Sequence, residues 1–191
     1  SKAALMERTQ CSATTLRAAI DRGMLRLYKK EINRFASASF VPAELPTLSA
    51  EQREAHRQII QSFGDKDITL LHGVTSSGKT SIYMHLVKDA LDLGQQALYL
   101  VPEIALTTQL TRRLKAVFGE RLLIYHSKFS DNERVDIWRK LLLSNEPCVV
   151  IGVRSAVFLP FSKLGVVIVD EEHENSYKQQ DPAPRYNGRN A

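Results

Sequence analysis

Hydrophobic and polar positions follow two alternating patterns over most of the chain. Short, almost continuous apolar runs predict strands at 68–71, 97–101, 122–125, 148–151 and 166–169. Longer stretches with apolar residues at helical spacing lie between them and predict helices at about 49–63, 79–93, 106–118 and 131–143. Strands that are apolar throughout and alternate with helices are typical of a parallel sheet covered on both faces. We therefore predict a three-layer α/β/α fold with a largely parallel sheet.

Residues 1–36 have a different pattern and precede a Pro-punctuated linker at 37–47. Two short helices are expected around a turn at Gln10 and Cys11, with Ser12 as the N-cap of the second helix and Gly23 as its stop. A strand is expected within 24–35. This order predicts a partial winged-helix DNA-binding module, with a small appendage that only packs as the alternative. Five basic residues favour nucleic acid: Arg17, Arg22, Arg26, Lys29 and Lys30.

Composition narrows the class of protein only slightly. The chain has 191 residues, a net charge of +5 and two cysteines in unlike contexts. That length suits one well-cored domain with a small appendage, and the charge weakly favours an anionic partner. The cysteines argue against a disulfide framework or a structural zinc site in this segment, and Cys148 is expected to be a small core residue. No run reaches the length of a membrane span, so we expect a cytoplasmic protein without a membrane partner.

The stretch 73–80, GVTSSGKT, follows a predicted strand and opens a predicted helix, which is the context of a phosphate-binding loop. Its backbone N–H groups and the helix N-terminus would hold the phosphates of ATP. Lys79 would reach the β- and γ-phosphates, and the Thr80 hydroxyl would bind Mg²⁺. The loop residues expected to contact nucleotide are Gly73, Val74, Thr75, Ser76, Ser77, Gly78, Lys79 and Thr80.

A second candidate group follows the last predicted strand. Asp170 ends that strand, the position from which a carboxylate holds Mg²⁺ in P-loop enzymes, and Glu171 could activate the attacking water. Adjacent carboxylates repel each other, and a divalent cation would relieve this. The alternative is a solvated acidic turn. His173 would either couple this site to a neighbouring element or cap the turn.

The motifs resemble those of a known family. The loop at 73–80 and Asp170 to His173 are similar to motifs I and II of superfamily 2 DEXH helicases. The stretches VPEIALTTQL (101–110), YHSKFSDNER (125–134), IGVRSAVFLPF (151–161) and DEEHENSYKQQ (170–180) narrow the resemblance to the PriA family of replication-restart helicases, also called primosomal protein N′.

This resemblance implies that 48–191 form the first RecA-like P-loop NTPase lobe of an ATP-dependent 3′→5′ DNA helicase that acts in fork restart and primosome assembly. The second lobe, with its arginine finger, would be absent from this fragment, which would be monomeric and inactive or very weak. ATP and Mg²⁺ would be needed, with zinc only elsewhere in the full protein. The implied partners are single-stranded and branched fork DNA, single-strand-binding protein and primosome proteins, in a nucleoid-associated setting in the bacterial cytoplasm.

The resemblance also assigns roles to individual residues. Gln52 would read adenine, unless it is a helix-surface glutamine, and Arg154 would grip a DNA phosphate, unless it makes a structural ion pair. The closing aromatic-rich loop would bind single-stranded DNA and link it to hydrolysis, unless it is merely flexible. The residues expected to bind DNA are Pro102, Glu103, Arg154, Ser155, Tyr177, Lys178, Arg185 and Tyr186. Two other classes stay open: a P-loop enzyme such as a kinase, and a non-catalytic DNA-binding module.

Overall fold

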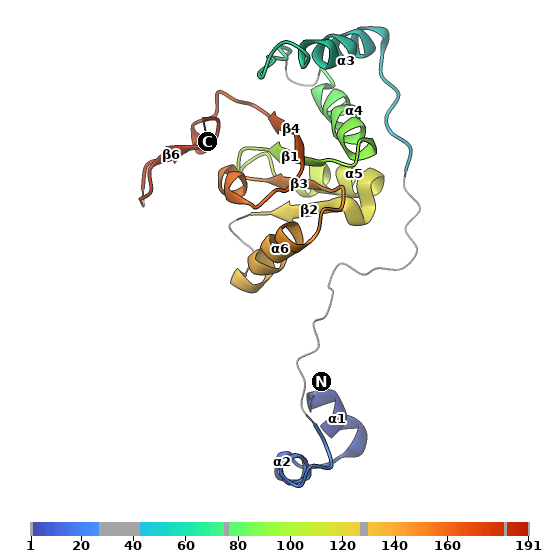
Figure 1. The fold of residues 1–191 in the computed structure, drawn as a ribbon, viewed down its shortest axis with the longest axis vertical. Helices are drawn as coiled ribbons and strands as arrows, with labels where there is room; N and C mark the ends of the chain where they lie inside the picture. The colour runs from blue at the N-terminus through green and yellow to red at the C-terminus, as the bar shows by residue number, and fades with distance from the viewer. Residues whose placement is uncertain (1, 27–42, 75–76, 127–129, 182, 191) are drawn as a thin grey trace. The chain divides into compact units, whose positions relative to one another are not determined.

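The computed structural model describes residues 2–26, 43–74, 77–126, 130–181 and 183–190. Its contacts divide the chain into two compact units, Ser1–Ala36 and Ser37–Ala191 (Figure 1). Each unit is described by itself below. Within the described residues, no helix is both long and apolar enough to cross a membrane.

The first unit contains two helices, α1 (Lys2–Thr9) and α2 (Ala13–Asp21). Ser12 caps α2, because its hydroxyl oxygen accepts a hydrogen bond of 3.1 Å from the Thr15 backbone N–H. Gly23 follows the helix with φ of +72°, a left-handed conformation that glycine adopts without strain. The predicted helices and their end signals are confirmed. Most of the predicted strand and part of the linker fall at 27–42, outside the described residues, so the winged-helix module stays a prediction.

The second unit is built on a parallel sheet of four strands: β1 (Gln96–Leu100), β2 (Leu122–Tyr125), β3 (Val149–Gly152) and β4 (Leu164–Val169). They lie side by side in the order β2-β3-β1-β4, and every neighbouring pair is parallel. The carboxyl ends of all four strands therefore meet at one edge, where ligands bind in sheets of this kind. The predicted parallel sheet is confirmed.

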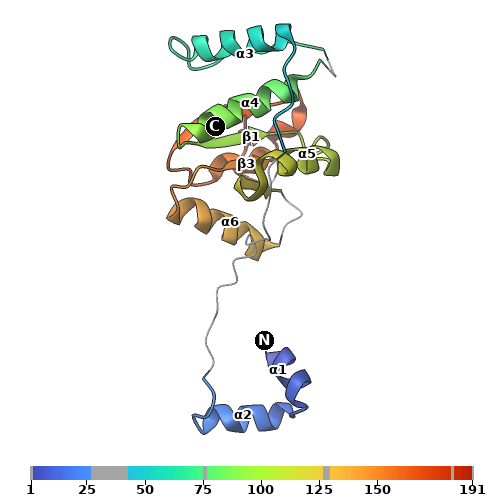
Figure 2. The ribbon, with the colours of Figure 1, turned by 90° about the vertical axis from the view of Figure 1, so that its right-hand side faces the viewer.

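Helices cover both faces of this sheet (Figure 2). They are α4 (Lys79–Asp92), α5 (Thr108–Phe118) and α6 (Asp131–Leu143), whereas α3 (Ala50–Ser62) packs against α4. Helices α4 and α5 lie on one side of the sheet and α6 on the other, as predicted for a three-layer fold. Helix α5 begins two residues later than expected because the Thr107 hydroxyl caps it. The described part of the unit also contains three 3₁₀ turns, η1 (Gly119–Arg121), η2 (Arg154–Phe158) and η3 (Asn175–Tyr177). A short antiparallel pair, β5 (Lys178–Gln179) and β6 (Tyr186–Asn187), lies near the end of the chain.

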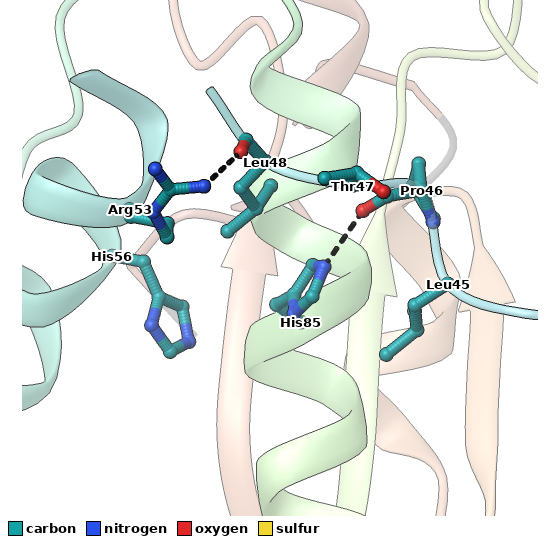
Figure 3. Close-up of a pocket in the computed structure, with 7 residues that line it drawn as sticks. All are labelled: Leu45, Pro46, Thr47, Leu48, Arg53, His56 and His85. Carbon is teal, nitrogen blue, oxygen red and sulfur yellow. Dashed lines mark hydrogen bonds between the residues drawn. The ribbon is translucent and has the colours of Figure 1, made fainter. Parts of the chain in front are cut away.

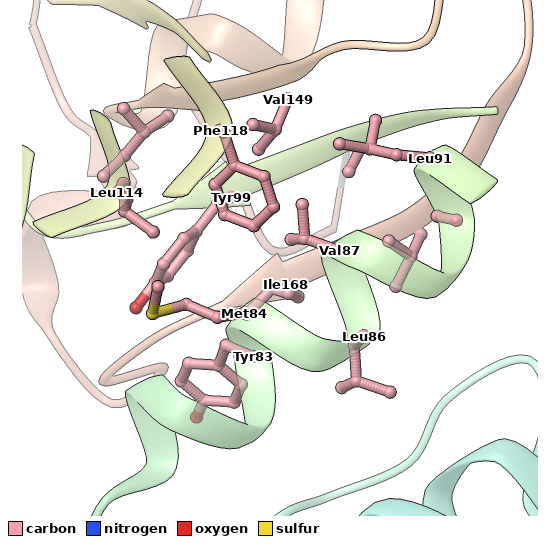
Figure 4. Packing of buried hydrophobic residues seen from close by; sticks show 14 of the residues in the cluster. Tyr83, Met84, Leu86, Val87, Leu91, Tyr99, Leu114, Phe118, Val149 and Ile168 are labelled. Atoms are coloured by element: carbon pink, nitrogen blue, oxygen red, sulfur yellow. The ribbon is translucent and has the colours of Figure 1, made fainter. Parts of the chain in front are cut away.

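The main core lies between the sheet and helices α4 and α5 (Figure 4). Met84 and Val87 from α4 pack there with Tyr99 from β1 and Leu114 from α5, and these four side chains are at most 1% exposed. Full burial of an aliphatic side chain contributes roughly 1.5–3 kcal/mol. Cys148 is also buried, and its burial raises the pKa of the thiol to about 11. Its predicted role as a small core residue is confirmed.

The predicted strand at 68–71 is wrong. The described backbone there has no strand, and the side chains of Ile68 and Leu70 are 85% and 73% exposed. The Thr69 hydroxyl instead bonds to the hydroxyl of Ser62, the last residue of α3. The described backbone of this segment does not pair with the sheet, although Leu71 packs against the core.

Candidate functional site

The loop before α4 has the geometry that its glycines predict. Gly78 is the N-cap of α4 and has φ of +81°, a conformation costly for any residue with a Cβ atom. A Cβ atom on Gly78 would lie 2.2 Å from the Gln52 side-chain nitrogen. The Gln52 amide therefore lies close against Gly78, at the positive end of the α4 dipole. Thr75 and Ser76 lie outside the described residues, and Val74 is 76% exposed.

Lys79 faces the acidic group from the far end of the sequence. Its ammonium donates a 2.7 Å hydrogen bond to the Gly73 carbonyl and lies 3.7 Å from a carboxylate oxygen of Glu171. The Lys79 side chain is 17% exposed and that of Glu171 is 34% exposed. The fold thus brings Lys79 and Glu171 together, although they are far apart in sequence. The Lys79 ammonium is a positive charge that is able to neutralise phosphate charge.

Asp170 is held from several directions at the end of β4. Its N–H donates to the Leu100 carbonyl at 3.0 Å, which ties the ends of β4 and β1 together. One carboxylate oxygen accepts a 3.0 Å hydrogen bond from the Tyr99 hydroxyl, and the other accepts one of 3.1 Å from the Glu171 N–H. Burial raises the pKa of this carboxyl, an effect that the Tyr99 hydrogen bond opposes.

Glu171 has an unusual backbone. Its φ is +46°, in the left-handed region that residues other than glycine adopt at a cost of roughly 1–2 kcal/mol. Such outliers cluster at functional sites, where the surrounding structure enforces them. Here the turn directs the carboxylate of Glu171 toward Lys79 and within 3.7 Å of the His173 imidazole.

The residues present fit a magnesium–nucleotide complex. Thr80 and Asp170 supply a hydroxyl and a carboxylate, hard oxygen donors of the kind that Mg²⁺ prefers. Among the described residues, no group of three or more His, Cys, Asp and Glu side chains could hold a metal by itself. Mg²⁺ in nucleotide sites usually takes one or two protein ligands and completes its shell with phosphate and water. A cation beside Asp170 would also offset the burial that disfavours its ionised form.

Gln52 lies beside the loop, but its amide is engaged at both ends. Its side-chain oxygen accepts from the Ser49 N–H at 2.9 Å in the capping box of α3, and its nitrogen donates to the Ser77 carbonyl at 3.3 Å. Gln52 thus has a structural role in capping α3 and contacting the loop, whereas its contact with adenine stays a prediction.

A cavity of about 510 Å³ adjoins the segment that leads into α3 (Figure 3). In it, Arg53 donates to the Leu48 carbonyl at 2.6 Å, and His85 contacts the Pro46 carbonyl at 3.0 Å. These bonds fix residues 45–48 and hence the start of α3. The cavity contains none of the predicted phosphate-binding residues.

The structure corrects the expected role of Tyr177. This side chain is 1% exposed, and its hydroxyl donates to the Asp170 carbonyl at 2.5 Å and to the Leu100 carbonyl at 3.2 Å. A ring so deeply buried cannot stack on a base. Tyr177 instead anchors the closing segment, residues 174–190, to the strand ends that carry the acidic group.

Arg154 also anchors the closing segment. Its guanidinium donates to the carbonyls of Ser176 and Lys178, each at 3.2 Å. A second contact is the packing of the Tyr186 ring against Phe158, with centroids 4.8 Å apart. Among the described residues Arg154 makes these hydrogen bonds and not the ion pair given as its alternative, and its contact with a DNA phosphate stays a prediction. Both contacts join the closing segment to η2.

The remaining predicted DNA-binding residues differ in exposure. Lys178, Arg185 and Glu103 are exposed, Ser155 is half-buried and Pro102 is buried. The Pro102 carbonyl accepts hydrogen bonds from the N–H groups of Ala105 and Leu106, so this residue shapes the turn after β1. His173 is 69% exposed and lies next to Glu171, a position compatible with its expected coupling role.

Sequence reasoning missed two tyrosines beside the acidic group. Tyr99 lies in the middle of β1, and Tyr83 lies on α4 one turn after Thr80; both are buried. Their rings pack edge to face with centroids 5.6 Å apart. The sequence carried one signal for Tyr99, because its hydroxyl lies in a predicted strand of otherwise apolar residues. A buried phenol usually requires a hydrogen-bond partner.

The comparisons with known proteins agree with this geometry. The sequence model of the family described as DEAD/DEAH box helicase matches residues 49–187. Similar proteins named "Replication restart protein PriA" occur in Synechocystis sp., with 41% identity over 97% of this chain and 22% of that protein, and in Bacillus subtilis, with 40% identity over 98% and 24%. The protein of that name from Helicobacter pylori strain ATCC 700392 is 52% identical over 63% of this chain and 19% of its own length. The chain thus spans about a quarter or less of these curated relatives.

Proposed function

The chain belongs to the DEAD/DEAH box helicase family, and from that premise we propose that it is the ATP-binding lobe of an ATP-dependent DNA helicase. The observation that carries the proposal is the approach of the Lys79 ammonium to within 3.7 Å of Glu171, next to Asp170. A phosphate-binding lysine, a carboxylate for a cation and a second carboxylate for water are the parts that ATP hydrolysis requires.

Each residue has a role in the proposed chemistry. The loop N–H groups and Lys79 bind the phosphates, and Thr80 with Asp170 would hold Mg²⁺. When bound, that ion would neutralise charge on the phosphates. Glu171 accepts a proton from the water that attacks the γ-phosphorus, and His173 lies close enough to transmit changes at Glu171 to a neighbouring element.

The proposed DNA side is the closing segment. Lys178 and Arg185 are exposed and can meet phosphates, and Tyr186 can offer part of its ring. The segment is attached through Tyr177 to the carbonyl of Asp170 and through Arg154 to η2. DNA that moves the segment would therefore act directly on the residue proposed to hold the cation.

The wider role is proposed from the relatives. Their name, replication restart protein, supports a helicase that acts in restarting replication in a bacterial cell. The resemblance to the PriA family adds 3′→5′ movement and, as partners, single-strand-binding protein and primosome proteins. The resemblance assigns the arginine finger to a second lobe. That group contributes about 10³- to 10⁵-fold to the rate, so we propose that this chain alone binds nucleotide weakly and turns over little.

The test is the binding of a fluorescent ATP analogue with Mg²⁺ to the chain and to Lys79→Ala. Lys88→Ala is a matched control, because Lys88 lies on the same helix and pairs with Asp92. We expect weaker binding only in Lys79→Ala. Equal binding by all three proteins would remove the proposed site. Phosphotransfer to a small molecule would favour a kinase, and DNA binding with no nucleotide binding would favour a non-catalytic module.

A further inference from the structure

Tyr99 occupies a position that its strand alone does not explain. It lies in β1, with 0% of its surface exposed, and its hydroxyl donates to an Asp170 carboxylate oxygen at 3.0 Å. The phenol therefore contacts the carboxylate that the proposed function assigns to the cation.

The ring has little freedom to move. It packs in the core between the sheet and α4, edge to face with Tyr83 at an interplanar angle of 71° (Figure 4). Close-packed interiors hold side chains in single rotamers, so the hydroxyl is fixed relative to the sheet. The other oxygen of Asp170 is held by the Glu171 N–H, and the residue's backbone is held by Leu100 and Tyr177. The Tyr99 hydroxyl thus completes the orientation of the carboxylate.

We propose that Tyr99 is a positioning residue for the divalent cation: its hydroxyl holds the Asp170 carboxylate in the orientation that a magnesium–nucleotide complex requires. The inference rests on the proposed function. Groups that orient metal ligands commonly change metal affinity by about 10- to 100-fold when they are removed. A tyrosine that only fills the core would not change the cation requirement.

The test is Tyr99→Phe, which removes one oxygen and keeps the ring that packs against Tyr83. Binding of the fluorescent ATP analogue is followed by anisotropy, first in EDTA and then over a titration with Mg²⁺. Direct binding of Mn²⁺ in the presence of ATP, followed by electron paramagnetic resonance, supplies a second readout. Circular dichroism checks that each protein is folded. Tyr125→Phe is the matched control, because Tyr125 is 8% exposed at the end of β2, where it contacts Arg134.

We expect the Mg²⁺ concentration at half-saturation to rise on the order of 10-fold in Tyr99→Phe. Affinity in EDTA should stay within about twofold of the unaltered chain, and Tyr125→Phe should match that chain in both conditions. The same Mg²⁺ and Mn²⁺ midpoints in all three proteins would overturn the inference while leaving the proposed function intact. If the unaltered chain binds nucleotide with no dependence on Mg²⁺ or Lys79, the proposed function fails, and the role of Tyr99 fails with it.

Discussion

Replacing Tyr177 with phenylalanine tests whether the closing segment is anchored in the fold or displayed for DNA. The substitution keeps a ring that is 1% exposed but removes the hydroxyl that donates to the carbonyls of Asp170 and Leu100. A buried acceptor left without its donor costs about 1–3 kcal/mol. We therefore expect the free energy of unfolding to fall by about that amount and Tm to fall by about 2–12 °C, since a domain of this size loses about 2–4 °C per kcal/mol.

The assay is urea unfolding followed by tryptophan fluorescence and circular dichroism, with thermal unfolding in parallel. Tyr186→Phe is the control, because the recorded contact of Tyr186 is made by its ring against Phe158 and not by its hydroxyl. Its stability should change by less than about 0.5 kcal/mol. A ring that stacks on bases would tolerate Phe in both stability and DNA affinity. Equal stability of Tyr177→Phe and the unaltered chain would therefore refute the anchoring role.

Three other predictions follow from the site. Gly78→Ala should abolish Lys79-dependent nucleotide binding, because the new Cβ atom would lie 2.2 Å from the Gln52 amide and alanine would be strained at the φ of +81°. Adding Gln52→Ala should not restore binding, since the backbone strain remains. Arg154→Ala should speed tryptic cleavage of the closing segment several-fold without changing Tm by more than about 3 °C, and an unchanged cleavage rate would mean that other contacts hold the segment. Burial raises the folded-state pKa of Asp170 above its ordinary 3.8, so above that pH the folded protein binds more protons than the unfolded chain does. The contribution of this carboxyl to stability therefore falls as pH rises through the folded pKa. Without Mg²⁺, Asp170→Asn should therefore be more stable than the unaltered chain at pH 7, with a difference that shrinks in acid; a difference that is constant with pH would contradict this account.

The parallel sheet and the position of the loop at the start of α4 could be predicted from the sequence, because both rest on local signals, whereas the strand expected before the loop was wrong. Continuous apolar strands between helices have few other solutions, and a glycine before Lys79 is needed where φ is positive. The end of β4 could likewise be read from an apolar run that stops at Asp170. These features require no knowledge of distant contacts.

The errors arose where a distant partner decides the outcome. The run at 68–71 has a strand pattern, but no described strand pairs with it, and periodicity alone does not show whether a partner strand is present. Tyr177 lies among polar residues and looks exposed in sequence. Its burial depends on the carbonyls of Asp170 and Leu100, which only the folded sheet brings to it. Tyr99 was missed for the same reason, since its partner follows 71 residues later.

The most direct test of the central claim is to measure the affinity of the chain for the fluorescent ATP analogue with Mg²⁺, with and without a short oligothymidylate. The closing segment is bonded to Asp170, so DNA bound there should change nucleotide affinity, and nucleotide must change DNA affinity by the same factor. We predict a reciprocal change of about fivefold or more that disappears in Lys79→Ala. Nucleotide and DNA that bind with no effect on each other would contradict the account.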